Sequence, residues 1–253
     1  LVDRGADVNA ESGRFGTPIL AAAAQGDDCM PIFTLLMDKG ANINHQGGEC
    51  RSALQAYFHS YQGNVESFRF LLEHCADVNA KGGKYGTALI AACASGIQQR
   101  EKYVRLLLDH GADVNAQSEE YGTALIAACQ SCFDEGNTQI VRWLLDCGAD
   151  VNAQGGKHGT ALSAACSWND KHRSPYLLGQ CPNINVNAQG GTFGTALQAA
   201  AYSGQTLSVR LLLDRRARLN VRDGKYHSAL NGAIISGHWN IVKILLAAGA
   251  TPD

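Results

Sequence analysis

Residues 79–93 read Asn-Ala-Lys-Gly-Gly-Lys-Tyr-Gly-Thr-Ala-Leu-Ile-Ala-Ala-Cys, and the recurrence of this phrase decides the fold. An asparagine is followed eight positions later by Thr or Ser, then by a small residue and by Leu or Ile. The phrase occurs seven times, and successive asparagines are 35, 35, 36, 37, 35 and 33 residues apart. Such a period predicts stacked supersecondary units, each too small to bury its own apolar face. The asparagines are Asn9, Asn44, Asn79, Asn115, Asn152, Asn187 and Asn220.

The third unit shows how one repeat is expected to fold. Thr87 is positioned as a helix N-cap, because its hydroxyl can accept from the free backbone N–H groups at a helix start. Residues 88–95 then form a short helix with a small-residue face, which lets neighbouring helices approach closely. Val104 and Leu107 lie at helical spacing on a second helix that packs against the first. Gly111 fits the left-handed end of that helix, and a turn leads into the next unit.

These residues carry a family resemblance. Gly-Ala-Asp-Val-Asn-Ala, the eight-residue step to Thr-x-Leu, the paired alanines and Ile-Val-x-x-Leu-Leu together resemble the ankyrin repeat over essentially the whole chain. The resemblance implies an all-α fold, an ankyrin-repeat solenoid of stacked helix–turn–helix units joined by hairpin-like turns. We expect a single array over residues 1–253, with residues 1–10 as the tail of a preceding repeat. The repeats are expected at 11–45, 46–80, 81–116, 117–153, 154–188, 189–221 and 222–253.

The chain departs from the family pattern in its turns. The family's Thr-Pro-Leu-His is here Thr-Ala-Leu followed by Ile90, Ile126, Ser163 or Gln198, so the turn loses a histidine that bonds nearby backbone in the family. The variant Asn-Ala-Gln-Gly-Gly-x-aromatic-Gly-Thr-Ala-Leu looks like the C-terminal arrays of fungal NACHT–ankyrin signalling proteins.

The fifth unit is the irregular one, because a proline falls within its second helix. Ser174 and Pro175 predict a late start for this helix, with Ser174 as N-cap and Pro175 at the first helical position.

Composition narrows the classes of function. A chain that is 45% hydrophobic and 17% charged can bury a sizeable core, and its net charge of -2 gives no general attraction to nucleic acid or to an anionic membrane. Cys93, Cys129 and Cys166 stand six positions after the hydroxyl residue, where other repeats have alanine, so they are expected to be core residues. With no Asn-x-Ser/Thr sequence either, a reducing, cytoplasmic location is favoured.

Motifs for catalysis or cofactor binding are weak. A phosphate-binding loop needs Gly-Lys-Ser/Thr, but Lys84 and Lys157 are followed by Tyr85 and His158. Cys129-Gln-Ser-Cys132 is a lone CxxC, whereas structural zinc needs two further ligands. We therefore expect no enzyme activity, no catalytic residue, no metal and no cofactor.

The turn tips are the candidate binding residues. In stacks of the ankyrin type, the turns and first helices line a concave surface that family members use to bind protein partners. A rim of aromatic and charged side chains suits such binding. An alternative is that each aromatic side chain packs on the adjacent turn and the charges are merely solvated, and both can hold together. The candidates are Arg14, Phe15, Lys84, Tyr85, Glu120, Tyr121, Lys157, His158, Phe193, Lys225 and Tyr226.

The favoured function is a non-catalytic protein–protein interaction module, the recognition array of a larger intracellular signalling protein. The alternative is the targeting domain of a parent enzyme, an NTPase or a ubiquitin-ligase adaptor, which a Walker-type site upstream of Leu1 would favour. The partner is a protein of unknown identity, with no nucleic acid and no membrane. We expect a monomer, or weak self-association through uncapped ends, because the last unit keeps apolar Ile234, Ile235, Ile241 and Ile244.

Overall fold

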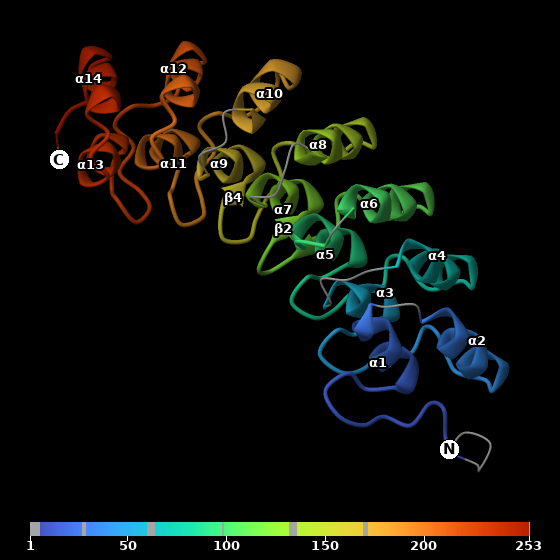
Figure 1. The fold of residues 1–253 in the computed structure, drawn as a ribbon. Helices are drawn as coiled ribbons and strands as arrows, with labels where there is room; N and C mark the ends of the chain where they lie inside the picture. The colour runs from blue at the N-terminus through green and yellow to red at the C-terminus, as the bar shows by residue number, and fades with distance from the viewer. Residues whose placement is uncertain are drawn as a thin grey trace. The chain divides into compact units, whose positions relative to one another are not determined.

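The computed structural model describes residues 6–26, 29–59, 64–97, 99–131, 136–168 and 172–252, and helix pairs recur along the chain (Figure 1). The chain divides into two compact units, Leu1–Ser118 and Glu119–Asp253, here called unit 1 and unit 2.

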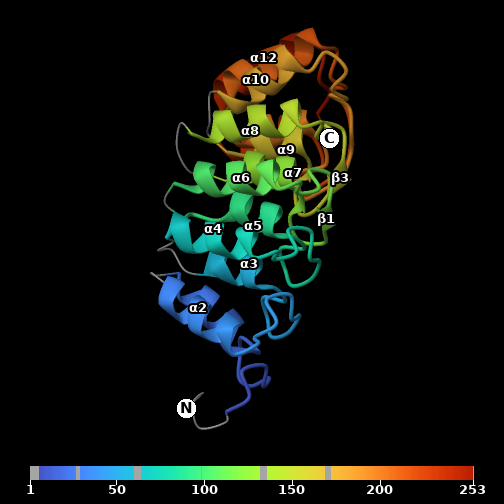
Figure 2. The same cartoon turned by 90° about the vertical axis from the view of Figure 1, so that its right-hand side faces the viewer.

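Unit 1 contains three helix pairs. Its first helices α1, α3 and α5 pack side by side in one layer, and its second helices α2, α4 and α6 pack in another (Figures 1 and 2). The turns that precede the first helices α1 and α5 include antiparallel bridges from Ser12 to Gly16 and from Gly82 to Gly86. The elements are α1 (Pro18–Gln25), α2 (Met30–Asp38), α3 (Ala53–Ala56), the 3₁₀ turn η2 (Tyr57–His59), α4 (Val65–Glu73), α5 (Ala88–Ala94), α6 (Arg100–Asp109) and β1 (Gln117–Ser118).

Unit 2 repeats the arrangement with four pairs. The strands β3 and β4 form a short antiparallel hairpin, with Gln154 opposite Thr160 and Gly155 opposite Gly159. Helix pairs and short hairpins confirm the predicted fold class. The elements are β2 (Gly122–Thr123), α7 (Ala124–Gln130), α8 (Gly136–Asp146), β3 (Gln154–Gly155), β4 (Gly159–Thr160), α9 (Ala161–Cys166), α10 (Arg173–Gln180), α11 (Ala196–Tyr202), α12 (Thr206–Asp214), α13 (Ala229–Ile235) and α14 (Trp239–Ala247).

Small side chains form the contacts between first helices. Cys93, Cys129 and Cys166 are fully buried, as expected for residues that stand in place of alanine. Burial raises the pKa of Cys166 to about 12, so this thiol stays protonated and behaves as a small apolar group. On the second helix of the third repeat, Val104 and Leu107 are buried as predicted.

Hydroxyl side chains cap the first helices. Thr87 Oγ1 accepts from the backbone N–H of Ile90 at 3.4 Å, and Ser52, Thr123, Thr160, Thr195 and Ser228 accept in the same way from the residue three positions on. Thr17 is the exception, because it makes no side-chain cap bond and is followed by Pro18. Proline is favourable there, since the first helical N–H has no partner within the helix.

Two glutamines take the place of the histidine that the turns lack. Gln55 Nε2 donates to the carbonyls of Ala80 and Gly86 at 3.0 and 2.9 Å. Gln198 Nε2 donates to those of Asp223 and His227. A long amide at this position therefore ties a first helix to the turn of the following repeat.

Five of the repeat asparagines join their repeat to the next by two hydrogen bonds, which we call the asparagine clasp. Asn79 Nδ2 donates to the carbonyl of Gly111 at 3.1 Å, and its Oδ1 accepts from the N–H of Asp113 at 2.7 Å. Asn9, Asn44, Asn152 and Asn187 make the same pair of bonds. In each case both partners are backbone groups 29–34 residues further along the chain.

The prediction for the start of the fifth unit's second helix is wrong. Helix α10 begins at Arg173, so Ser174 lies inside it and is fully buried. Its Oγ lies 2.6 Å from Ser208 Oγ and 3.3 Å from Gln205 Oε1, which ties α10 to α12. Pro175 is then the third helical residue, within the first turn, where a backbone N–H has no helical partner to lose.

Removing one clasp tests its contribution to stability. We expect Asn152→Ala to lower the free energy of unfolding by about 1–3 kcal/mol, because two hydrogen bonds are lost at a net value of about 0.5–1.5 kcal/mol each. Urea unfolding followed by circular dichroism measures the change. The matched control is Asn183→Ala, since that exposed side chain makes no hydrogen bond within the described residues. Equal stability of the two variants would contradict the role of the clasp.

Candidate functional site

The backbones of the turn tips are bonded to one another within each unit. A tip is the pair of residues three and two positions before the capping hydroxyl, and at four of the tips the N–H of the first residue donates to the carbonyl of the preceding tip. The bond from Glu49 to Arg14 in unit 1 measures 3.0 Å. In unit 2 the bonds from Lys157 to Glu120, Thr192 to Lys157 and Lys225 to Thr192 measure 3.3, 2.8 and 2.9 Å. The tip side chains therefore stand on a fixed backbone.

At most of the tips the first residue carries a charge and the second carries an aromatic ring or an imidazole. The charged first residues Arg14, Lys84, Glu120, Lys157 and Lys225 are exposed. The second residues Phe15, Tyr85, Tyr121, His158, Phe193 and Tyr226 are half-buried. Lysine also covers its neighbouring ring, with Lys84 Nζ 4.6 Å from the Tyr85 centroid and Lys225 Nζ 5.2 Å from that of Tyr226. These five tips thus combine a ring that packs with an accessible charge.

In unit 2 the tip rings form a row. The centroids of His158 and Phe193 are 6.4 Å apart with an angle of 23° between the rings, and those of Phe193 and Tyr226 are 6.2 Å apart at 30°. Tyr202, the last residue of α11, stacks on Tyr226 at 4.1 Å and 14°. These contacts fix the rings in place while leaving them partly exposed, as suits anchors for a bound chain.

Sequence reasoning missed one further position, seven residues after each hydroxyl. This position lies at or next to the end of the first helix or of the 3₁₀ turn that follows it, and it is occupied by Ala24, His59, Ala94, Gln130, Ser167, Tyr202 and Ile235. Three of these residues touch a tip: Tyr202 stacks on Tyr226, Ser167 lies 3.2 Å from His158 Nδ1, and His59 contacts Arg14. The signal was that the residue type varies widely at this position, whereas the position before it holds only small or apolar residues.

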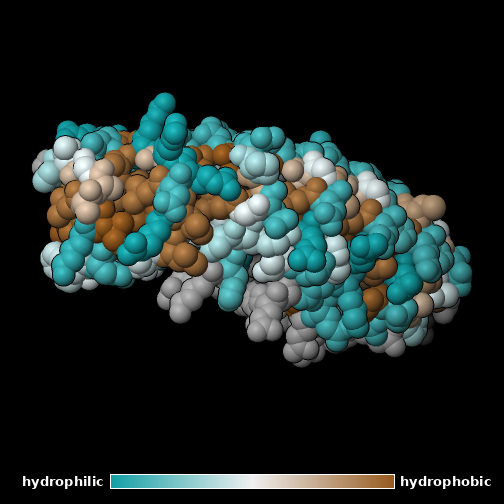
Figure 3. Space-filling model, turned by 90° about the horizontal axis from the view of Figure 1, so that it is seen from above, coloured by the Kyte–Doolittle hydropathy of each residue, from teal (hydrophilic) through white to brown (hydrophobic). Residues whose placement is uncertain are grey.

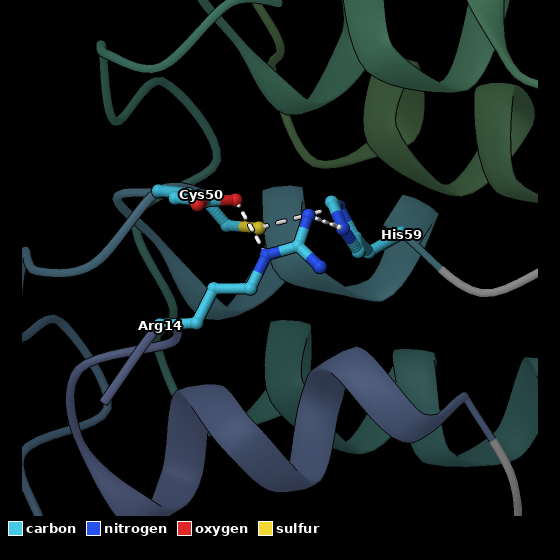
Figure 4. Close-up of polar contacts among 4 residues, drawn as sticks. Arg14, Cys50 and His59 are labelled. Atoms are coloured by element: carbon cyan, nitrogen blue, oxygen red, sulfur yellow. Dashed lines mark hydrogen bonds and ion pairs between the residues drawn. The ribbon is translucent and has the colours of Figure 1, made fainter. Parts of the chain in front are cut away.

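In unit 1 the tips and His59 enclose a pocket of about 270 Å³. Arg14 extends across it, its Nε donating to Glu49 Oε2 at 2.6 Å and its NH2 lying 3.0 Å from His59 Nε2 (Figure 4). On the other side of the imidazole, Nδ1 lies 3.7 Å from Cys50 Sγ. Lys84 and Tyr85 complete the wall.

These contacts fix the protonation of His59. A guanidinium has no acceptor, so Nε2 must accept from Arg14 and the neutral ring carries its proton on Nδ1, directed at Cys50. Burial lowers the pKa of His59, and the positive charges of Arg14 and then Lys84 lower it further. The imidazole is therefore neutral at pH 7.

Cys50 and His59 do not form a nucleophile and base. Burial raises the pKa of the Cys50 thiol, and the nearby Glu49 carboxylate raises it further, so the sulfur is protonated. The imidazole proton points toward that sulfur, which leaves His59 no lone pair with which to deprotonate it. Within the described ranges, no group of three His, Cys, Asp or Glu side chains is placed to hold a metal ion.

The structure brings the predicted residues together in two sets. In unit 1, Arg14, Phe15, Lys84 and Tyr85 lie around the pocket or beside it, since Phe15 packs edge-on against His59 at 5.6 Å. In unit 2, the row holds His158, Phe193 and Tyr226, with Lys157 and Lys225 next to it in the chain. Glu120 and Tyr121 join them through the backbone bond between Glu120 and Lys157.

Apolar side chains are exposed on the C-terminal helices of unit 2, where hydrophobic surface is extensive in Figure 3. Leu207, Trp239 and Leu246 are 52%, 62% and 48% exposed. Ile234 and Ile235 are also exposed, whereas Ile241 is fully buried. The expectation that these isoleucines form an uncapped apolar end is therefore wrong for Ile241. Its side chain faces the core of its own helix pair.

Comparison with known proteins identifies the repeat. A family model described as ankyrin repeats in three copies matches residues 19–118, 56–155 and 162–253. A search of curated proteins gave no significant match. In the part of the chain that the structure describes, no helix is both long and apolar enough to cross a membrane.

The neutral state of His59 can be tested by its titration. We expect Arg14→Gln to raise the pKa of His59 toward the usual value of about 6.5, because the variant removes one of the positive charges that lower it. Titration of the ring protons by nuclear magnetic resonance measures the shift. Arg105→Gln is the control, since Arg105 is an exposed arginine paired with Asp109 on α6.

The same shift has a consequence for stability. Since the folded state binds this proton less readily than the unfolded state, His59 destabilises the fold as the pH falls below about 6.5. Arg14→Gln should weaken this part of the acid sensitivity. An unchanged pKa of His59 in Arg14→Gln would contradict the contact between the two side chains.

Proposed function

The chain belongs to the ankyrin-repeat family, and on that premise we propose that it is a non-catalytic module that binds a protein partner through its turn tips. The observation that carries the proposal is the division at the tips, where an exposed charge stands beside a half-buried ring on a hydrogen-bonded backbone. A surface of this kind is already ordered before binding, so little entropy is lost when a partner docks.

A finer proposal concerns the setting of the module. The Gly-Gly-x-aromatic-Gly turns support a recognition array in a larger intracellular signalling protein of the fungal NACHT–ankyrin type. The alternative setting is the targeting domain of a parent enzyme, an NTPase or a ubiquitin-ligase adaptor. Reading the gene upstream of Leu1 separates the two, because a NACHT segment there would favour the signalling protein, whereas a hydrolase or ubiquitin-ligase segment would favour the parent enzyme. The buried, alanine-like cysteines support a cytoplasmic setting.

The exposed apolar residues of α12 and α14 support self-association. We propose that the protein is a monomer at low concentration and associates weakly at high concentration through this surface. Sedimentation velocity over a concentration series tests it. A sedimentation coefficient that is independent of concentration would rule out the association.

The binding surface can be tested with a peptide selected from a displayed library. In unit 2, the tip variant Lys157→Ala/Lys225→Ala removes two exposed tip charges. Arg210→Ala/Lys243→Ala removes two exposed charges from the second helices α12 and α14. We expect the tip variant to bind the selected peptide about tenfold more weakly, a loss of about 1.4 kcal/mol. Fluorescence anisotropy measures both affinities.

The second-helix variant is the control for the loss of positive charge. Because both double variants remove two positive charges, a general loss of attraction to an acidic peptide would weaken binding equally in both. A loss confined to the second-helix variant, or equal losses, would contradict binding at the tips of unit 2.

A further inference from the structure

The pocket of unit 1 has an excess of one positive charge. Its charged groups are Arg14 and Lys84 against Glu49, and His59 is neutral at pH 7. The Arg14–Glu49 pair is solvent-exposed, with 58% of each side chain accessible, so it is worth little on its own and does not shield the arginine from a ligand.

Arg14 presents hydrogen-bond donors that the protein does not use. A guanidinium carries five N–H groups in one plane. Nε–H goes to Glu49 and one hydrogen of NH2 goes to His59. Within the described residues the other three N–H groups have no acceptor. The bonds to Glu49 and His59 hold the guanidinium, and Figure 4 shows it reaching His59, so its orientation is set before a ligand arrives.

The polar groups of Gln55 and His59 on the floor of the pocket already have hydrogen-bond partners within the protein. Both hydrogens of Gln55 Nε2 are donated to backbone carbonyls, so this amide has no hydrogen to offer a ligand. The imidazole of His59 is occupied on both nitrogens, and the Cys50 thiol is a weak donor. Arg14, with the charge of Lys84 nearby, is therefore the group that can bind an anion.

The size of the pocket limits the ligand. At about 270 Å³ it lies just below the range of roughly 300–1,000 Å³ that holds small-molecule ligands. It therefore suits a single side chain of a docked protein. A single excess positive charge is balanced by a monoanion, whereas a phosphate dianion would leave net negative charge beside Glu49.

We propose that this pocket binds the carboxylate of an Asp or Glu side chain from the protein partner, with Arg14 as its hydrogen-bond donor and Lys84 as the second positive charge. This inference rests on the proposed function, and it gives unit 1 a preference for an acidic residue. Arginine suits the role because its planar donors match the two oxygens of a carboxylate.

The test uses blocked peptides, so that a side chain supplies the only charge. The probes are acetyl-Gly-Gly-Glu-Gly-Gly-amide, the same peptide with Gln, and the same peptide with phosphoserine. Each is added to the whole 253-residue chain, and the ring protons of His59 and the Nε–H of Arg14 are followed by nuclear magnetic resonance. We expect saturable shifts with the Glu peptide and none with the Gln peptide.

Variants separate the pocket from general charge attraction. Arg14→Gln is expected to weaken binding of the Glu peptide about tenfold, because it removes a charge-assisted hydrogen bond. Lys84→Gln leaves the Arg14 contacts in place and should weaken it by a smaller factor. Arg105→Gln is the matched control, since this arginine is similarly exposed, 56%, and is paired with Asp109 on α6.

Each other outcome overturns the inference. Equal shifts with the Glu and Gln peptides would remove the role of charge, and equal losses in Arg14→Gln and Arg105→Gln would remove the role of the pocket. Tighter binding of the phosphoserine peptide would assign the site to phosphate. If any of these occurs while the selected peptide still depends on Lys157 and Lys225, the carboxylate inference fails and the proposed function stands.

Discussion

The asparagine clasp is the interaction on which the stacking of repeats depends. Helix pairs of four to eleven residues per helix cannot bury their apolar faces alone, so each pair needs a neighbour in a fixed register. Hydrophobic contacts between alanines and leucines are not directional and would allow sliding. The clasp sets the register, because its two bonds require both the carbonyl and the N–H of the next repeat at hydrogen-bonding distance.

The surface follows from that register. With the repeats fixed, the turn tips come close enough for one backbone to bond to the next, and the side chains line up at the spacing of the repeat. The tip and the last residue of the first helix then share one face. In unit 1 this face is a charged pocket around His59, and in unit 2 it is a row of rings around Tyr202.

The period and the local signals allowed the helix pairs to be predicted, because helix caps and apolar spacing act within a few residues. Thr87 and Val104 behaved as their neighbours in the sequence indicated. Contacts between repeats were harder to foresee. Asn152 marked the repeat, but the sequence did not show that its partners lie 31 and 33 residues away. Ser174 resembled a cap because Pro175 follows it, and its contact with Ser208 in the next repeat's second helix could not be read from the local sequence. His59 was overlooked because it follows a helix of otherwise ordinary core residues.

The clasp also allows the surface of a repeat to change during evolution while its fold is kept. Both of its partners are main-chain atoms, so the asparagine places no demand on the identity of the side chains in the repeat that follows. A duplicated or exchanged repeat can therefore join the stack wherever its predecessor keeps the asparagine. The tip side chains take no part in the clasp, so they can change without disturbing it. New binding specificities can therefore arise when repeats are exchanged and the core is kept.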